Sequence, residues 1–242
     1  MNTATQNKGV KVKEGRTELA VPHKDGELTF IHPYHGPNVY ADVALSIQQA
    51  GLQTPTLAET ASLVHAAFHS DDKYSTEIKD LMKKRYFWAS TGIHYVPKEG
   101  AYIQDHPEIR KGMPFMEKSE LARKLEAHDP SVRFVPFGYK TEIMSALELA
   151  SNPFIQALAG GEEGAGKLAE IADKHRNRPY IWSFSSVDEP ITRVAALDSH
   201  WNVGDHRLNV NGNNHGNNRN GCAFGIALAT KITHMKTYTN LY

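Results

Sequence analysis

The 242-residue chain contains one cysteine, Cys222, so no disulfide can form within it. Its 27 basic and 27 acidic side chains cancel, which argues against a generic nucleic-acid binder that depends on clustered Lys and Arg. No apolar run approaches the roughly 20 residues that a membrane-spanning helix needs. The polar first 30 residues lack the apolar core of a signal peptide. We expect a soluble protein without nucleic-acid or membrane partners, either cytoplasmic or displayed on a virion or another surface by a different route.

The pattern of charge and periodicity predicts a flexible N-terminal arm over residues 1–30 and a single α+β domain over 31–242. Two prolines and a glycine predict a loop over 31–38. Thr56 and Glu59 have capping-box spacing ahead of an apolar stripe, which predicts a helix from Thr56. Further helices are expected over 75–86, 119–127 and 165–175, with a strand over 87–96 paired to 101–103 and more strands after residue 179.

A glycine-rich segment at 161–167 (GEEGAGK) has the spacing of a phosphate-binding P-loop. Leu168 stands where a Ser or Thr would be needed to hold magnesium, and two glutamates in the segment would repel phosphate. The sequence before it is also helical in pattern, whereas a P-loop follows a strand. A link between two helices explains the segment better, so we expect no nucleotide and no other cofactor.

His65 and His69 are four residues apart in the predicted helix, so both imidazoles lie on one face, as half of a metal site requires. The residues between them lack the general-base Glu of a zinc protease. Core packing for His65 and a favourable helix C-terminus for His69 explain the pair without a metal. The alternative is a metal-dependent enzyme, in which Asp71 or Asp72 would add a ligand and His32 or His35 would reach in from the loop over 31–38.

The most biased segment spans residues 198–221, DSHWNVGDHRLNVNGNNHGNNRNG. Twenty of its 24 residues are Asn, Gly, Asp, Ser, His or Arg, and seven of the twelve residues 209–220 are Asn. A long polar loop would explain part of this bias. It leaves unexplained the isolated Val203, Leu208 and Val210, which resemble strand anchors beneath a polar surface.

The six residue types are one or two base changes from an Asn codon by replacement of its adenines. In this codon relation, the C-terminal third of the chain resembles the variable proteins of diversity-generating retroelements. Those proteins have a C-type-lectin-like fold related to the formylglycine-generating-enzyme group. The closing residues 220–228 (NGCAFGIAL) are similar to the core strand of that fold, although Gly225 replaces its usual Arg. The resemblance implies an α+β fold with helices mostly N-terminal and a small antiparallel, β-rich C-terminal part. Glu189-Pro190 is followed by Ile191 instead of the Asn of a lectin calcium motif, so no calcium site is expected.

This resemblance implies a binding protein whose display region lies at about 180–230 and recognises a protein or glycan on another surface. No catalytic set of residues assembles in the sequence, so we expect a binding protein and not an enzyme; no feature indicates an oligomeric state. A third hypothesis is a structural protein whose Asn-rich loop has no partner. Trp201 would be the strongest anchor of the surface, since buried Trp dominates interfaces. The expected ligand-facing residues are Ser199, His200, Trp201, Asn202, Asn209, Asn211, Asn213, Asn214, His215, Asn217, Asn218, Arg219 and Asn220.

Overall fold

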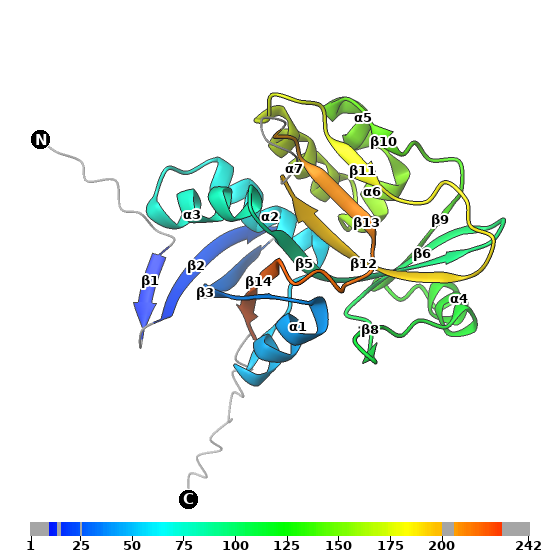
Figure 1. Ribbon diagram of the computed structural model, residues 1–242, viewed down its shortest axis with the longest axis horizontal. Coiled ribbons are helices and arrows are strands. Elements are labelled where there is room, and N and C mark those ends of the chain that lie inside the picture. Colours follow the sequence, from blue (N-terminus) through cyan, green and yellow to red (C-terminus); the bar gives the residue numbers. More distant parts are fainter. Residues whose placement is uncertain (1–9, 14–15, 25, 200–205, 229–242) are drawn as a thin grey trace, which may run out of the picture.

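The computed structural model describes residues 10–13, 16–24, 26–199 and 206–228 (Figure 1). The helices are α1 (Tyr40–Gln49), α2 (Leu57–Phe68), α3 (Lys73–Met82), α4 (Lys118–Glu126), α5 (Ala146–Ser151), α6 (Pro153–Leu158) and α7 (Glu162–Asp173). The strands are β1 (Val10–Lys13), β2 (Arg16–His23), β3 (Gly26–Asn38), β4 (Leu52–Gln53), β5 (Tyr86–Val96), β6 (Gly100–Asp105), β7 (Ile109–Arg110), β8 (Met113–Pro114), β9 (Val132–Pro136), β10 (Glu142–Ile143), β11 (Tyr180–Trp182), β12 (Ile191–Asp198), β13 (Asn209–Asn214) and β14 (Gly221–Ala227). Among these described helices, none has the length and apolar character to cross a membrane.

Across the described residues, twelve strands form one mixed sheet in the order β1-β2-β3-β14-β5-β12-β13-β11-β10. β4 pairs with β14, and β6 extends the sheet from β5 to β9, while β7 and β8 form a separate hairpin. Two neighbouring pairs are parallel, β14 with β5 and β11 with β13, and the other pairs are antiparallel. The sheet therefore joins strands from both ends of the chain, and the C-terminal β14 lies between β3 and β5 (Figure 1).

The sheet carries a large core on one face and a smaller one on the other. The larger core packs strand residues against α2, α5, α6 and α7, and paired strand residues that share this face include Cys222, Phe87, Leu197, Val210 and Ile181. On the opposite face, α1 places Tyr40, Val43 and Ile47 against Trp88 and Ala196. Because both faces are covered, β5 is buried along nearly its whole length, which explains its run of aromatic and aliphatic residues.

The N-terminal segment differs from the sequence-based prediction. The expected arm over 1–30 contains β2 and the start of β3, which pair with each other, and the expected loop over 31–38 belongs to β3. Thr17, Leu19 and Val21 are buried in alternation, which supports the strand, but the charged Arg16 and Glu18 and the polar Thr17 hide the apolar pattern in the sequence. Pro33 and Pro37 lie where the register of β3 with β14 shifts, so the missing proline N–H groups interrupt no regular ladder.

The predicted distribution of helices and strands was also wrong. The helices extend from α1 to α7, which ends at Asp173, and strands begin before residue 40. The C-terminal strands do not form a separate antiparallel part, since β14 pairs with β3 and, in parallel, with β5. Such long-range pairing is set by the tertiary fold and leaves no local signal in the sequence.

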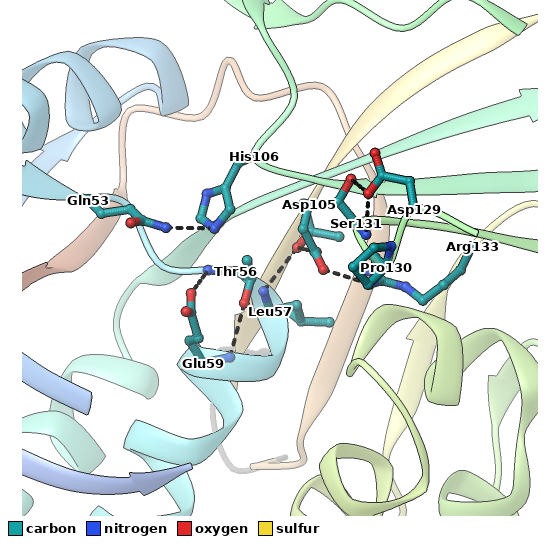
Figure 2. A network of polar contacts seen from close by, with 11 residues as sticks. Gln53, Thr56, Leu57, Glu59, Asp105, His106, Asp129, Pro130, Ser131 and Arg133 are labelled. Carbon is teal, nitrogen blue, oxygen red and sulfur yellow. Dashed lines mark hydrogen bonds and ion pairs between the residues drawn. The ribbon is translucent and has the colours of Figure 1, made fainter. Parts of the chain in front are cut away.

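The predicted helix start at Thr56 is confirmed. The Thr56 hydroxyl accepts a hydrogen bond from the Glu59 N–H at 3.2 Å, and the Glu59 carboxylate accepts one from the Thr56 N–H at 2.7 Å. A polar network continues from this helix start into β6 and β9 (Figure 2). The Leu57 N–H donates to the Thr91 hydroxyl at 3.0 Å, and that hydroxyl donates to Asp105 at 2.8 Å. The other oxygen of Asp105 accepts a hydrogen bond from Arg133 at 2.7 Å, so the network ties the start of α2 to β5, β6 and β9 (Figure 2).

Candidate ligand-binding surface

Within the Asn-rich segment, residues 209–214 form a strand inside the sheet and not a loop. β13 lies between β12, to which it is antiparallel, and β11, to which it is parallel. The rungs across these three strands place Asn209 beside Tyr180 and Asp198, and Asn211 beside Trp182 and Ala196. Val210 points to the larger core, as its isolated position in the polar segment suggested.

Asn209 and Asn211 lie on the face opposite the larger core, yet both are buried, with 1% and 8% of their surface exposed. The Asn209 side-chain N–H donates to the carboxylate of Asp198 at 2.7 Å, and Asp198 is itself buried. Burial and the negative charge of Asp198 raise the pKa of Tyr86 on the neighbouring strand. Asn209 therefore satisfies a buried carboxylate, which would be costly to leave without its partners.

Ser199, also expected in the ligand-facing set, is 1% exposed, and its backbone N–H donates to the Met82 carbonyl at 2.8 Å. The expectation that Ser199, Asn209 and Asn211 face a ligand therefore conflicts with their burial. The sequence could not show this, because the partners lie on other strands or helices. His200, Trp201 and Asn202 lie outside the described residues.

The backbone of β13 is fixed at Gly212 by close packing. The Tyr95 hydroxyl donates to the Gly212 carbonyl at 2.9 Å. A Cβ atom at this position would lie 2.7 Å from Cζ of the buried Phe154, which leaves no room for a side chain. The end of the strand is thus held by a contact that only glycine permits.

After β13, several asparagines hold the turn that leads to β14. The side-chain oxygens of Asn211, Asn214 and Asn218 accept hydrogen bonds from backbone N–H groups two residues later, at 2.8–3.2 Å. These are the local contacts that make Asn common in turns. The Gly216 carbonyl accepts a hydrogen bond from the Tyr40 N–H at 2.9 Å, which attaches the turn to the start of α1.

Asn220 fixes the other end of the turn. Its side-chain N–H donates to the Lys84 carbonyl at 2.6 Å, and its side-chain oxygen accepts a hydrogen bond from the Arg85 guanidinium at 2.8 Å. The backbone carbonyl of Asn220 also accepts from the Tyr86 N–H at 3.3 Å. Sequence reasoning missed Arg85 as part of this surface, since it precedes Asn220 by 135 residues.

Three of the residues 209–220 are exposed: His215, Asn217 and Arg219. They alternate with residues that hold the turn, and none of the hydrogen bonds described above involves their side chains. Asn213, Asn214, Asn218 and Asn220 are half-buried between them. The segment is therefore divided into side chains that build the scaffold and side chains that point to solvent.

The candidate metal site of His65 and His69 gains a third residue, Glu170, in the structure. His65 Nε2 lies 2.7 Å from a carboxylate oxygen of Glu170 on α7, and His69 Nε2 lies 3.8 Å from the same oxygen. The other expected ligands lie in different contacts: Asp72 caps α3, Asp71 pairs with Lys79, His32 contacts Glu77, and His35 contacts Ser46. Glu170 is 105 residues from His65, so no sequence spacing could have identified it.

Comparison with known proteins gives a fold and no family. No protein-family model and no curated protein matches the chain. A solved structure, described as "Accommodation of massive sequence variation in Nanoarchaeota by the C-type lectin fold", matches with a TM-score of 0.53 and 17% sequence identity. The match covers 78% of this chain and 94% of that chain, so the chain has a C-type lectin fold. The expected restriction of the resemblance to the C-terminal third was wrong, because the likeness spans most of the chain.

Proposed function

We propose that this protein binds a ligand, a protein or a glycan on another surface, through its C-terminal segment, and that the exposed positions of this segment are diversified in sequence. The observation that carries the proposal is the division within residues 209–220. Buried or turn-forming residues hold the backbone, while His215, Asn217 and Arg219 extend to solvent between them. A surface that changes its specificity needs such a fixed scaffold beneath replaceable side chains.

The solved structure with the same fold supports this proposal, because its description concerns a C-type lectin fold that accommodates massive sequence variation. The codon relation of Asn, His, Arg, Ser, Asp and Gly supports diversification of this chain by replacement of adenines.

The ligand-contacting set that we propose is smaller than the sequence indicated. It contains His215, Asn217 and Arg219, flanked by half-buried Asn213. His200, Trp201 and Asn202 stay in the set on sequence grounds. We assign Ser199, Asn209, Asn211, Asn214, Asn218 and Asn220 to the support of the surface.

The chemistry of the exposed set favours a polar ligand. Imidazole, amide and guanidinium groups offer several hydrogen-bond donors, and Arg85 adds a second guanidinium beside Asn220. Such donors recognise hydroxyl and carboxylate oxygens, which both glycans and acidic protein surfaces present.

The proposal is tested by applying the purified protein to an array of glycans and an array of cell-surface proteins. The variant with His215→Ala, Asn217→Ala and Arg219→Ala should keep the melting temperature of the wild type. Its affinity for each ligand found should fall at least about ten-fold, because Arg side chains contribute strongly to binding at interfaces. Binding that is unchanged in this variant, or no binding by the wild type to either array, would contradict the proposal.

A matched control comes from α4 and the turn after it, which carry exposed side chains of similar chemistry. The variant with Arg123→Ala, Glu126→Ala and His128→Ala removes an equal number of exposed side chains away from the C-terminal segment. It should bind the same ligands as the wild type.

A further inference from the structure

His65, His69 and Glu170 bring one carboxylate and two imidazoles together at the junction of α2 and α7. One ligand atom from each residue lies within 4.8 Å of those of the other two. The two imidazole rings are 4.3 Å apart between centroids, as expected for histidines one helical turn apart. The side chains are 24%, 43% and 61% exposed, so solvent can reach the group.

We propose that these three residues bind a divalent transition-metal ion, with zinc as the best fit. Two His nitrogens, one carboxylate oxygen and one water complete the four ligands that zinc takes. Bonds of about 2.0–2.1 Å in a tetrahedral site place ligand atoms about 3.3 Å apart. The present distances of 2.7 Å and 3.8 Å from the Glu170 oxygen to the two imidazoles lie on either side of that value.

The orientation of His69 provides a second, independent observation. Its Nδ1 lies 2.8 Å from the backbone carbonyl of His65, and a carbonyl can only accept, so Nδ1 carries the proton. This contact leaves the lone pair on Nε2, the atom that faces Glu170. Metal-binding histidines typically have their second nitrogen fixed in this way by a carbonyl or carboxylate.

The position at the end of α2 also favours a cation. The helix ends at Phe68 with His69 as its C-cap, so the last backbone carbonyls and the negative end of the helix dipole lie next to the site.

The site would join α2 to α7 on the side of the sheet that holds the larger core. Both helices contribute buried residues to that core, including Val64 and Leu168. The C-terminal segment with its exposed residues belongs to other elements, so this metal site does not depend on the proposed ligand-binding function.

The test is zinc binding to the full chain without a polyhistidine tag, measured by titration calorimetry and by thermal denaturation. We expect one equivalent of zinc per chain and a rise of about 5–10 °C in melting temperature at a zinc concentration 100 times the Kd. His69→Ala and Glu170→Gln should each lower the affinity at least about ten-fold and abolish most of the rise. Two variants are used so that a folding defect in one, seen by circular dichroism, leaves the other informative.

His128→Ala is the matched control. His128 is also exposed, and its Nδ1 likewise contacts a nearby backbone carbonyl, that of Glu126, at 2.9 Å. It belongs to no three-ligand group in the described residues. This variant should bind zinc as the wild type does. The proposal is overturned if the wild type binds no stoichiometric zinc, or if Glu170→Gln and His69→Ala bind it as tightly as His128→Ala.

Discussion

The division of the Asn-rich segment into scaffold and exposed positions predicts opposite effects for the same substitution at two sites. Asn209→Ala removes the hydrogen bond to Asp198, in which both side chains are at least 98% buried. A hydrogen bond to a charged group contributes about 1.5–3 kcal/mol, and the buried carboxylate would lose one of its partners. We expect a loss of about 2 kcal/mol, which lowers the melting temperature by about 4–8 °C for a chain of this size.

Asn217→Ala is the matched control, because Asn217 is exposed and only eight positions later in the sequence. Exposed substitutions of this kind cost under about 0.5 kcal/mol. Urea denaturation at 25 °C followed by circular dichroism measures both free energies of unfolding. Equal costs for the two variants would refute the reasoning: if both are small, Asn209 supports nothing, and if both are large, Asn217 is part of the scaffold.

Further predictions concern the helix cap, the crowded start of β14 and the lone thiol. Burial raises the pKa of Asp72, but hydrogen bonds from Ser75, Ser70 and two backbone N–H groups outweigh it and lower the pKa to about 2. Because the pKa of Asp72 is lower in the folded protein than in the unfolded chain, its carboxylate stabilises the fold at pH values above the unfolded-state pKa. Asp72→Ala should therefore lower the free energy of unfolding by about 1 kcal/mol at pH 7. This loss should shrink as the pH falls from about 4 toward 2, because the wild-type carboxylate becomes protonated. A loss that does not change with pH would contradict the lowered pKa of Asp72. Gly221→Ala would place a Cβ 1.9 Å from Nε1 of the buried Trp88. It should lower the free energy of unfolding, measured by urea denaturation, by about 3 kcal/mol or more, and a loss under about 1 kcal/mol would contradict this packing. Burial raises the pKa of Cys222 to about 12. The folded protein should therefore react with a thiol reagent at least about 100-fold more slowly than the protein unfolded in urea. Equal rates would show that the thiol is accessible in the folded protein.

The parts of the fold that depend on neighbouring residues could be predicted from the sequence. The capping box of Thr56 and Glu59 and the long apolar strand over 87–96 involve residues close together, and the structure contains both. The strands β2 and β3 were missed because their polar residues conceal the alternation, and because the pairing of β3 with β14 depends on residues about 190 positions away.

The candidate sites show the same dependence on long-range contacts. Asn209 and Asn217 have identical side chains in the same biased segment, so composition could not tell which one is buried. The difference arises from Asp198 on the neighbouring strand. Likewise, His65 and His69 were recognisable as a helical pair, whereas Glu170 reaches them only because α7 packs against α2.

The most direct test of the central claim, that the exposed positions of the C-terminal segment are the diversified ones, is the sequence of the DNA that flanks this gene. We predict a near-copy of its 3′ end beside a reverse-transcriptase gene, with mismatches at adenines. The mismatches should fall in the codons of His215 and Arg219, where the copy should have the adenines of an Asn codon. The absence of such a copy, or a copy that matches the gene at the codons of His215 and Arg219, would contradict the account.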